Sequence, residues 1–411
     1  MLLYNIGISL YECGAAVAGL WSNKARKWRT GRRGLLEAIA QRMQPHERRV
    51  WIHAASLGEF EQGRPVIERL KRAYPDIKVV LTFFSPSGYE IRKDYPNADY
   101  VFYLPTDTPR NVAHFLDAIN PEVAIIIKYE FWLGYLEALR QRGIPTYLIS
   151  AIFRRNSIFF RPWGGAWRKA LTAFRGIYVQ DEASQSLLME LGVESIVAGD
   201  TRFDRVRDIA MAAKVLPVVE KFRGDSHLFV AGSTWGRDEE LIIELANNHP
   251  DIKFIIAPHE ICEARMRHIE THIRGGVTRY TSHSDEAMAT AQCMILDTMG
   301  LLSSVYRYAT WAYIGGGFGR GVHNTLEAAT FALPIAFGPR YHKFKEARDM
   351  IALCAACSVD SAKALETWFV PLTPNSEVWR RASSAAGDYT AKNCGATALI
   401  IEELGKHLAD R

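Results

Sequence analysis

The residues of this sequence best suited to chemistry lie where apolar segments end in glycine or in small side chains. Trp311 to Ile314 is apolar and leads into three consecutive glycines, Gly315 to Gly317, and a helical pattern begins near Asn324. Glycines let the backbone approach a ligand closely, and the unpaired N–H groups at a helix start attract an anion. This junction of strand, glycine loop and helix predicts a phosphate-binding site.

Asn324 and Glu327 stand three residues apart at the start of that predicted helix. The spacing matches a capping box, in which Asn324 caps the helix and Glu327 completes the cap. It would also let the Glu327 carboxylate reach a ribose hydroxyl, and the local pattern leaves both interpretations open. A second apolar segment, Pro334 to Phe337, ends in Gly338 and Pro339, so two strands would bring loops to the edge where parallel sheets bind ligands.

A candidate proton acceptor follows the first apolar strand. Trp51 to His53 leads into small side chains, and Glu59 stands at the start of a predicted helix. The helix dipole is expected to keep Glu59 ionised, so that it can take a proton from an attacking hydroxyl. An acidic residue in the first turn can also do no more than stabilise its own helix, and position alone leaves both interpretations open. Glu130 follows another apolar strand, Val123 to Lys128, at the same predicted edge.

The elements that would position these residues form two series in which strands alternate with helices. The first series has strands near residues 50–54, 79–84, 100–104, 123–128, 146–150, 177–180 and 196–198. A charged stretch over residues 205–225 interrupts the alternation, and the second series has strands near 227–231, 254–257, 294–297, 312–314 and 335–337. Such alternation is typical of doubly wound parallel sheets. The sequence therefore predicts two Rossmann-like α/β domains.

Composition agrees with this organisation and excludes some functions. A chain of 411 residues exceeds the usual size of a single core, and 48% hydrophobic with 23% charged residues is ordinary for a globular protein. The net charge of +5 traces largely to the first forty residues, which indicates a local basic surface and not a nucleic-acid-binding protein. Six scattered cysteines indicate neither a disulfide framework nor a zinc site.

The N-terminal segment combines an apolar stretch with a basic flank. Met1 to Trp21 carries one charged residue, Glu12, and is followed by the basic residues Lys24, Arg26, Lys27, Arg29, Arg32 and Arg33. The pattern favours an interfacial helix, whose apolar residues enter the acyl boundary while the cations meet anionic head groups. Glu12 and three glycines argue against a membrane span, and the order of the charges argues against a signal peptide. A core helix of the first domain and, more weakly, a nucleic-acid arm stay as alternatives.

Several short motifs follow one another in order along the chain: HAASLGEFEQGRP, QDEAS, GDTRFD, GSTW, GGG, HNTLEAA and FGP. With these motifs the sequence resembles the bacterial transferases of 3-deoxy-D-manno-octulosonic acid (Kdo), from about residue 1 to residue 350. The resemblance implies a GT-B fold, in which two Rossmann-like domains face each other across a cleft. It also implies a membrane-associated glycosyltransferase of lipopolysaccharide biosynthesis, which moves Kdo from CMP-Kdo onto a lipid A precursor (lipid IVA) at the cytoplasmic face of the inner membrane.

Together with the pattern of elements, the resemblance divides the chain into five segments. Residues 1–34 are expected to form the membrane-associated helix with its basic flank, and residues 35–205 the acceptor-binding domain. Residues 206–225 are expected to be a linker and residues 226–374 the CMP-sugar-binding domain. Residues 375–411 are expected to be helices that cross back to the first domain, by analogy with other GT-B proteins.

The resemblance also assigns roles to single residues. Glu59 matches the family's catalytic base, Glu130 matches a glutamate that helps to stabilise the transition state, and Arg202 occupies a place where the family usually has lysine. The residues assigned to donor binding are Ser233, Thr234, Pro258, His259, Met299, Gly300, Leu301, Gly316, Gly317, Asn324, Thr325, Leu326 and Glu327. Two of them have structural alternatives, because Ser233 would suit a helix cap and Met299 would suit a core.

Two positions depart from the family's pattern. His259 stands where the family has arginine, so the bidentate guanidinium is lost, and Arg265 or Arg340 would have to supply the charge. Ala328 stands where the family usually has proline.

The sequence also bears on mechanism and partners. No Asp-x-Asp pair follows an apolar strand and no His/Cys cluster has ligand spacing, so a reaction without metal or cofactor is the simplest hypothesis. One base, with no second carboxylate placed as a nucleophile, favours inversion in a single displacement. The expected partners are CMP-Kdo, a lipid A precursor and the membrane surface, and no nucleic acid. Two other functions stay open: a GT-B enzyme acting on another nucleotide sugar (a UDP-sugar transferase or an epimerase), and a non-catalytic membrane-bound scaffold.

Overall fold

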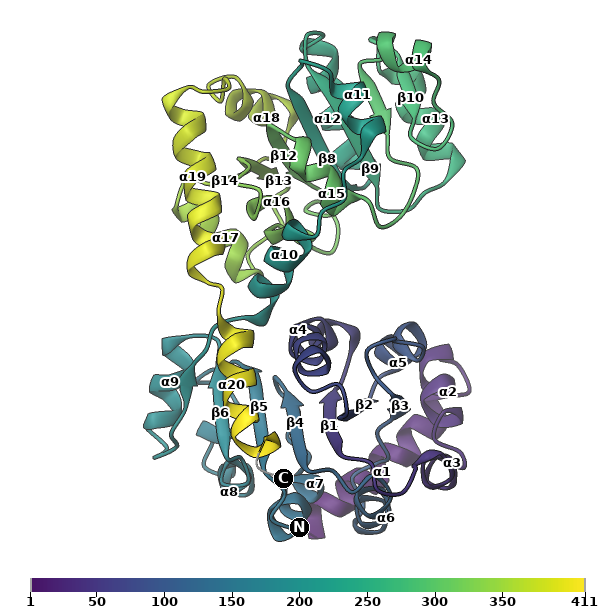
Figure 1. Ribbon diagram of the computed structural model, residues 1–411, viewed down its shortest axis with the longest axis vertical. Helices are drawn as coiled ribbons and strands as arrows, with labels where there is room; N and C mark the ends of the chain where they lie inside the picture. The colour runs from purple at the N-terminus through teal and green to yellow at the C-terminus, as the bar shows by residue number, and fades with distance from the viewer. Residues whose placement is uncertain (1, 410–411) are drawn as a thin grey trace. The chain divides into compact units, whose positions relative to one another are not determined.

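The computed structural model describes residues 2–409, which form two α/β units (Figure 1). Unit 1 comprises the chain up to Arg205 together with the chain from Cys394 onward, and unit 2 comprises Val206–Asn393. Each unit is built on its own seven-stranded parallel sheet. The two Rossmann-like domains predicted from the alternation of strands and helices are therefore present.

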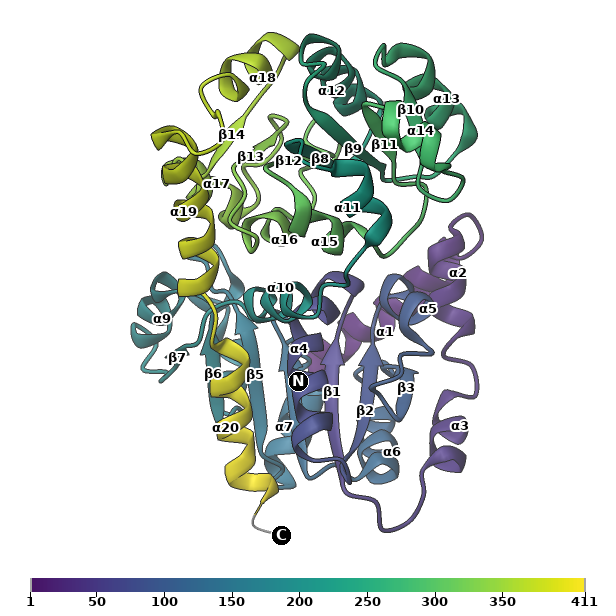
Figure 2. The same cartoon turned by 45° about the horizontal axis from the view of Figure 1, so that its top comes forward.

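The sheet of unit 1 has the strand order β3-β2-β1-β4-β5-β6-β7. Figure 2 shows its strands side by side and pointing the same way: β1 (Arg49–Ala54), β2 (Lys78–Phe83), β3 (Tyr100–Tyr103), β4 (Val123–Ile127), β5 (Thr146–Ala151), β6 (Gly176–Val179) and β7 (Ile196–Val197). Strands β1, β4 and β5 are buried along their whole length, as expected for a parallel sheet that helices cover on both faces. The strand order reverses at β1, which has β2 on one side and β4 on the other. Ligands of such sheets bind at this switch point, beside the carboxyl ends of the strands.

The helices between these strands are α4 (Leu57–Ala73), α5 (Pro86–Arg92), α6 (Pro109–Ile119), α7 (Leu133–Gln141), α8 (Gly165–Leu171), α9 (Glu182–Met189) and α10 (Thr201–Met211). The last helix of the chain, α20 (Ala396–Leu408), also belongs to unit 1, since its Ile400 and Leu404 join the same apolar core as Val50 and Phe60. Asp204 holds the start of α20, because its two carboxylate oxygens accept the N–H groups of Gly395 and Thr397 at 2.7 Å each.

Three helices precede the first strand: α1 (Leu2–Ala18), α2 (Asn23–Thr30) and α3 (Leu35–Arg42). One face of α1 is fixed to unit 1, because the Tyr4 hydroxyl donates to Asp107 at 2.6 Å and the Thr106 hydroxyl donates to Glu12. The other face and the turn that follows expose Leu3, Leu10 and Trp21 by 85%, 67% and 79%. Within residues 2–409, no helix combines the length and apolarity needed to cross a membrane.

The sheet of unit 2 has the order β10-β11-β9-β8-β12-β13-β14, and its switch point lies between β8 and β12. Its strands are β8 (Leu228–Thr234), β9 (Lys253–Pro258), β10 (Val277–Arg279), β11 (Cys293–Ile295), β12 (Trp311–Ile314), β13 (Ile335–Phe337) and β14 (Ala356–Ser358). Its helices are α11 (Pro217–Arg223), α12 (Gly236–Asn248), α13 (Glu263–His272), α14 (Asp285–Thr290), α15 (Leu302–Val305), α16 (Leu326–Ala329), α17 (Lys345–Ala352), α18 (Ala362–Phe369) and α19 (Glu377–Lys392).

Two segments differ from the division expected from the sequence. Residues 206–225 were expected to be a linker, but α10 continues to Met211 and α11 buries Val219 and Phe222 in unit 2. Residues 375–411 were expected to cross back to the first domain; α20 belongs to unit 1 as expected, whereas α19 belongs to unit 2. The chain therefore passes between the units within α10 and again between Asn393 and Cys394.

Candidate active site

Glu59 stands in the first turn of α4, directly after the carboxyl end of β1. Its Oε2 accepts hydrogen bonds from the Ser56 N–H at 2.9 Å and from the Ser56 hydroxyl at 3.1 Å, so Glu59 completes a capping box. Within residues 2–409 its Oε1 accepts no hydrogen bond that would occupy it. The Oε2 of Glu59 therefore serves as part of the helix cap, and the Oε1 could accept a proton.

The electrostatics of Glu59 differ from the expectation that a helix start would simply keep it ionised. Burial raises the pKa of Glu59, and the nearby charge of Glu130 raises it further, while the hydrogen bonds from Ser56 act in the opposite direction. A carboxylate whose pKa lies above its ordinary value is a stronger base, and this suits proton abstraction from a hydroxyl.

Glu130 follows β4, the strand next to β1 at the switch point. Lys128 has a φ of +69°, which turns the chain sharply at the end of β4. The Glu130 Oε2 accepts a hydrogen bond from the Trp132 indole Nε1 at 2.8 Å and lies 3.5 Å from the Nε2 of His53. Because the Glu130 side chain is only 15% exposed, this carboxylate is held in a largely buried position beside β1.

His53 is a member of this group that sequence reasoning did not single out. It lies on β1 with none of its surface exposed, and its Nδ1 is 2.9 Å from the hydroxyl of Thr82 on β2. A histidine within the apolar run VWIHAA was the signal available in the sequence, because a buried imidazole needs partners that only neighbouring strands can provide.

Arg202 lies at the start of α10, and its charge is matched inside unit 1. Its Nε and Nη2 both donate to Oδ2 of the buried Asp200, at 2.9 and 2.7 Å, and its backbone N–H donates to the other carboxylate oxygen. A guanidinium balanced in this way presents a weaker net charge to a ligand than the sequence suggested.

In unit 2, the three glycines after β12 serve the packing of loops. A Cβ on Gly315 would lie 2.2 Å from the carbonyl oxygen of Ser233, and one on Gly317 would lie 2.6 Å from the backbone of Gly338. The N–H of Gly316 already donates to the carboxylate of Asp238 at 2.9 Å. The N–H of Gly316 is therefore used within the unit, and the assignment of Gly316 and Gly317 to donor binding stays a prediction.

Asp238 is a second residue that sequence reasoning missed. It is fully buried in α12 and also accepts hydrogen bonds from the Tyr313 hydroxyl at 2.8 Å and from the Trp235 N–H at 2.9 Å. Burial raises the pKa of Asp238, and these donors counteract the rise. One carboxylate thus ties the loop after β8 to the loop after β12.

The segment from Asn324 to Glu327 forms half of the expected capping box, because the Asn324 Oδ1 accepts the Leu326 N–H at 3.2 Å at the start of α16, while Glu327 contacts the Asn324 side chain and not its backbone N–H. The helix α16 begins only at Leu326, with Thr325 before it, and the amide of Asn324 donates to Glu327 Oε1 at 2.9 Å through side chains. The side chains of Thr325 and Leu326 are 1% and 0% exposed, so neither can present a side chain to a donor. Asn324 is exposed and Glu327 is half-buried, and their side chains form a hydrogen-bonded pair.

The loop after β8 also places some predicted residues differently. The Thr234 hydroxyl points inward and donates to Glu239 at 3.0 Å, and Trp235, not Ser233, occupies the N-cap position of α12. Arg265 donates to the same Glu239 at 2.7 Å, so it is already paired inside the unit. Of the two arginines considered as replacements for the missing charge, Arg340 is the exposed one and donates to the Gly319 carbonyl at 2.7 Å.

Three rings stack at the carboxyl ends of β8, β9 and β12. His259, which follows Pro258, lies 4.8 Å from the Trp235 ring and 4.4 Å from the His323 ring, and Trp235 Nε1 donates to His323 Nε2 at 3.1 Å. Burial lowers the pKa of His323, and His259 lowers it further. His323 was not identified from the sequence. The three rings therefore contact one another at the carboxyl ends of the strands beside the switch point.

The loop from Asp297 to Leu301 lies at the carboxyl end of β11. Met299 is 75% exposed, so its interpretation as core filler is wrong, and Gly300 has a φ of +85° that favours glycine. Leu301 stands directly before α15.

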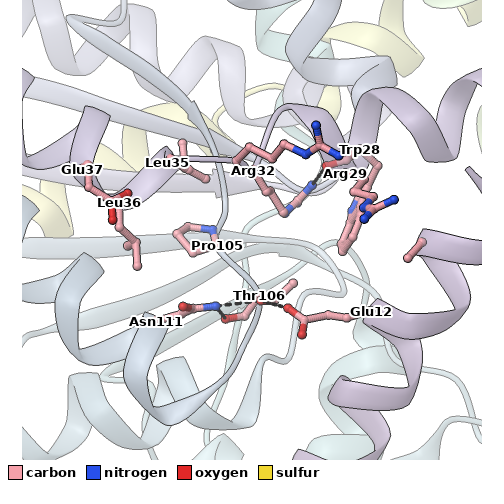
Figure 3. A pocket seen from close by; sticks show the side chains of 13 residues that line it. Glu12, Trp28, Arg29, Arg32, Leu35, Leu36, Glu37, Pro105, Thr106 and Asn111 are labelled. Atoms are coloured by element: carbon pink, nitrogen blue, oxygen red, sulfur yellow. Dashed lines mark hydrogen bonds between the residues drawn. The ribbon is translucent and has the colours of Figure 1, made fainter.

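The basic flank divides into one buried and five exposed residues. Arg32 donates to the carbonyl oxygens of Leu104, Trp28 and Phe84 at 2.9 to 3.0 Å, and burial lowers its pKa to about 10. Figure 3 shows Arg32 beside Trp28 in a pocket of about 280 Å³ that Glu12 and Thr106 also line. The guanidinium of Arg32 is thus used in contacts within unit 1, whereas Lys24, Arg26, Lys27, Arg29 and Arg33 are exposed. Within residues 2–409, no group of three or more metal-ligating side chains comes together.

Two doubly wound parallel sheets, one in each unit, define a protein of the GT-B fold. Solved structures agree on the fold. The UDP-GlcNAc 2-epimerase of Neisseria meningitidis matches with a TM-score of 0.58 and 16% identity, over 87% of this chain and 100% of that chain. MurG of Acinetobacter baumannii matches with a TM-score of 0.54 and 12% identity, over 87% of this chain and 99% of that chain.

Comparison of sequences narrows the resemblance to one family, which comparison of folds does not. Residues 28–205 match the family model described as 3-deoxy-D-manno-octulosonic-acid transferase (kdotransferase). The 3-deoxy-D-manno-octulosonic acid transferase of Bordetella pertussis is 28% identical over 378 residues, which cover 86% of each chain. That of Haemophilus influenzae is 23% identical over 378 residues, which cover 89% of this chain and 88% of the relative. The resemblance to Kdo transferases predicted from the motifs is therefore confirmed, and it extends well beyond the N-terminal domain.

Proposed function

We propose that this protein transfers Kdo from CMP-Kdo to a lipid A precursor. The observation that carries the proposal is the pair of carboxylates, Glu59 and Glu130, at the switch point of unit 1. Both lie within residues 28–205, which match the kdotransferase family model, and the curated relatives share the name of the activity. The geometry supports a proton acceptor here because one oxygen of Glu59 stays available and burial raises its basicity.

In the proposed reaction, Glu59 takes the proton of an acceptor sugar hydroxyl. The oxygen forms a bond to the anomeric carbon of Kdo as the bond from that carbon to the CMP phosphate oxygen breaks, and CMP leaves with the electron pair. Inversion follows from a single displacement. Glu130 is proposed to stabilise the positive charge that develops on the Kdo ring as the bond to phosphate lengthens.

Donor binding is proposed for unit 2. The supporting features are the ring stack of Trp235, His259 and His323, the exposed loop at Met299, and the pair Asn324 and Glu327. We further propose that transfer needs no metal, because CMP carries one phosphate whose charge N–H groups and a cation can balance. Undiminished transfer in the presence of EDTA is the expected result.

We also propose that the N-terminal helix rests on the inner membrane at its cytoplasmic face. Its outward face exposes Leu3, Leu10 and Trp21, and exposed cations such as Lys24 and Arg29 follow. Apolar burial together with attraction to anionic head groups is what holds an interfacial helix. Since the inward face of α1 is fixed to unit 1, this helix would hold the whole unit at the surface.

Substitution on the outward face of α1 tests membrane binding without disturbing its packing. Leu10→Glu should reduce pelleting with phosphatidylglycerol-containing vesicles by about tenfold, since a carboxylate replaces apolar surface in the acyl boundary. Val378→Glu on α19, where Val378 is also 51% exposed, is the matched control and should pellet as the wild type does. Equal pelleting of both variants would refute the interfacial helix.

The activity is tested by incubating the full chain with CMP-Kdo and a tetraacylated disaccharide phosphate, followed by mass spectrometry. The expected product is heavier than the acceptor by one or more Kdo residues, with release of CMP. UDP-GlcNAc serves as the control donor and should give no product. Absence of a Kdo-bearing product with fully folded protein would refute the proposed function.

A further inference from the structure

The imidazole of His53 lies beside the Glu130 carboxylate of the proposed active site. It is fully buried on β1, with its Nδ1 2.9 Å from the Thr82 hydroxyl and its Nε2 3.5 Å from the Oε2 of Glu130. Thr82 is the residue on β2 that stands opposite His53 in the register of the sheet, so the first contact is fixed by strand pairing. When one ring nitrogen of a histidine is held in this way, the state of the other nitrogen is set as well.

The hydrogen bonds around Thr82 determine which nitrogen of His53 carries the proton. The indole Nε1 of Trp51 lies 2.8 Å from Thr82 Oγ1, and because an indole N–H can only donate, the hydroxyl oxygen accepts this bond. Within residues 2–409, the remaining acceptor for the hydroxyl proton of Thr82 is Nδ1 of His53. The reverse assignment would leave that buried proton without a partner. Nδ1 therefore accepts, and the neutral imidazole carries its proton on Nε2, toward Glu130.

A second donor converges on the same carboxylate oxygen. The single N–H of Trp132 lies 2.8 Å from Glu130 Oε2 and 3.3 Å from His53 Nε2. The shorter contact takes the indole proton, so Trp132 and His53 both direct an N–H at Oε2 of Glu130. The 2.8 Å bond from Trp132 fixes this carboxylate, and the Nε2 of His53 adds a longer contact of 3.5 Å to the same oxygen.

We propose that His53 is a positioning residue, whose tautomer is set by Trp51 and Thr82 and whose Nε2–H holds the Glu130 carboxylate beside Glu59. The role rests on the proposed function, because it gives the position of Glu130 a purpose in transfer. We call Trp51, Thr82 and His53 the His53 relay. All three side chains are almost fully buried, so water cannot replace any of their hydrogen bonds. The relay runs across neighbouring strands, from Trp51 on β1 to Thr82 on β2 and back to His53 on β1.

The relay also bears on the charge of the two carboxylates. Glu59 faces Glu130 from α4, Tyr4 faces it from α1, and Lys128 and Tyr129 precede it on the same loop. Burial raises the pKa of Tyr4 and that of Tyr129, so both phenols are neutral where the carboxylates titrate. His53 lowers the pKa of the Glu59 carboxyl, so its loss should move the titration of Glu59 to higher pH.

Nuclear magnetic resonance of the full chain labelled with ¹⁵N-histidine tests the tautomer without any assay of transfer. The His53 signals are identified by their loss in His53→Gln, and the expected spectrum shows Nε2 protonated and Nδ1 unprotonated. Thr82→Val removes the hydroxyl and should abolish the single tautomer, while Thr82→Ser keeps the hydroxyl and should preserve it. A proton on Nδ1 in the wild type, or no difference between Val and Ser, would overturn the proposal.

A matched pair of substitutions then tests the role in catalysis. The amide nitrogen of His53→Gln can reach the place of Nε2, whereas that of His53→Asn can reach only the place of Nδ1. His53→Asn should lower kcat by about tenfold or more with little change in KM, and should move the acidic limb of the pH profile upward. His53→Gln should restore most of the turnover and the wild-type profile.

Thermal unfolding of both variants separates positioning from simple support of the fold. Equal losses of turnover in the two variants, in proportion to their loss of stability, would overturn the positioning role. So would an unchanged pH profile in His53→Asn. If the wild type itself transfers no Kdo, the proposed function is wrong. The ¹⁵N spectra then still show whether Trp51 and Thr82 set the tautomer of His53.

Discussion

At the scale of single residues, the proposed function gives Glu59 both of the roles that the sequence offered as alternatives. Its Oε2 accepts the hydrogen bonds of Ser56 and completes the cap of α4, while Oε1 stays available for a proton. A cap and a base therefore do not compete for the same atom. Burial and the charge of Glu130 raise the pKa of this carboxyl, and the structure thereby holds a charge at some cost to stability.

The raised pKa of Glu59 predicts how stability depends on pH. The protonated carboxyl is favoured in the folded chain, so its stabilising contribution is present below the unfolded pKa of about 4.3 and is lost as pH rises through the folded value. Glu59→Gln removes this dependence and can still accept the Ser56 N–H. In urea unfolding, the free energy of unfolding of Glu59→Gln should rise relative to that of the wild type between about pH 4 and pH 7. A difference in unfolding free energy between Glu59→Gln and the wild type that stays constant with pH, or that falls as pH rises, would contradict this explanation.

At the scale of elements, loops at the switch points are packed more tightly than their glycines suggested. Gly315 and Gly317 touch the backbones of neighbouring loops, and Asp238 uses the N–H of Gly316. The three glycines thus hold the carboxyl ends of β8, β12 and β13 together. In the proposed function, this packing would support the loops that carry Trp235 and His323.

This packing predicts unequal effects of alanine at two nearby glycines. A Cβ at Gly317 would lie 2.6 Å from the Gly338 backbone, whereas one at Gly319 would meet nothing closer than the Gly316 carbonyl at 3.5 Å. Gly317→Ala should lower the free energy of unfolding by about 1–3 kcal/mol, because the loops must move apart. Gly319→Ala is the control and should change it by less than about 0.5 kcal/mol. Urea denaturation of both variants measures the difference, and equal effects would exclude close packing as the reason for Gly317.

The sequence predicted most of these elements because apolar runs mark buried parallel strands. The strands β10 (Val277–Arg279) and β14 (Ala356–Ser358) were missed, since each has three residues and lies at an edge of its sheet. Glu59 and Glu130 were found because they follow such runs. His53 and Asp238 were not found, because their partners Thr82 and Gly316 lie on other strands or loops and no local pattern records that contact.

At the scale of the whole molecule, the chain separates into two units that carry different chemistry. Unit 1 holds the carboxylates, the basic flank and α1, and unit 2 holds the ring stack and the loop at Met299. The C-terminal helix α20 completes the core of unit 1, so this unit is built from both ends of the described chain. In the proposed function, acceptor and proton acceptor belong to unit 1, and the nucleotide belongs to unit 2.

This division predicts selective stabilisation by the nucleotide product. CMP at about 100 times its dissociation constant should stabilise the protein by about 2.7 kcal/mol and raise its melting temperature, because it binds only the folded state. UMP and UDP at the same concentration should raise it much less. The replacement His259→Ala removes the ring that stacks on both Trp235 and His323 and should weaken the CMP effect. A larger shift with UDP would favour a UDP-sugar enzyme instead.

The most direct test of the account is transfer by Glu59→Gln with CMP-Kdo and the tetraacylated acceptor. The variant keeps the cap of α4 and lacks the base, so transfer should fall by about a hundredfold or more while the melting temperature stays close to that of the wild type. Glu61→Gln, on the same helix, removes a carboxylate that pairs with Arg92 at 2.9 Å and should retain transfer. Near-normal product formation by folded Glu59→Gln would contradict the central claim that Glu59 accepts the proton of the attacking hydroxyl.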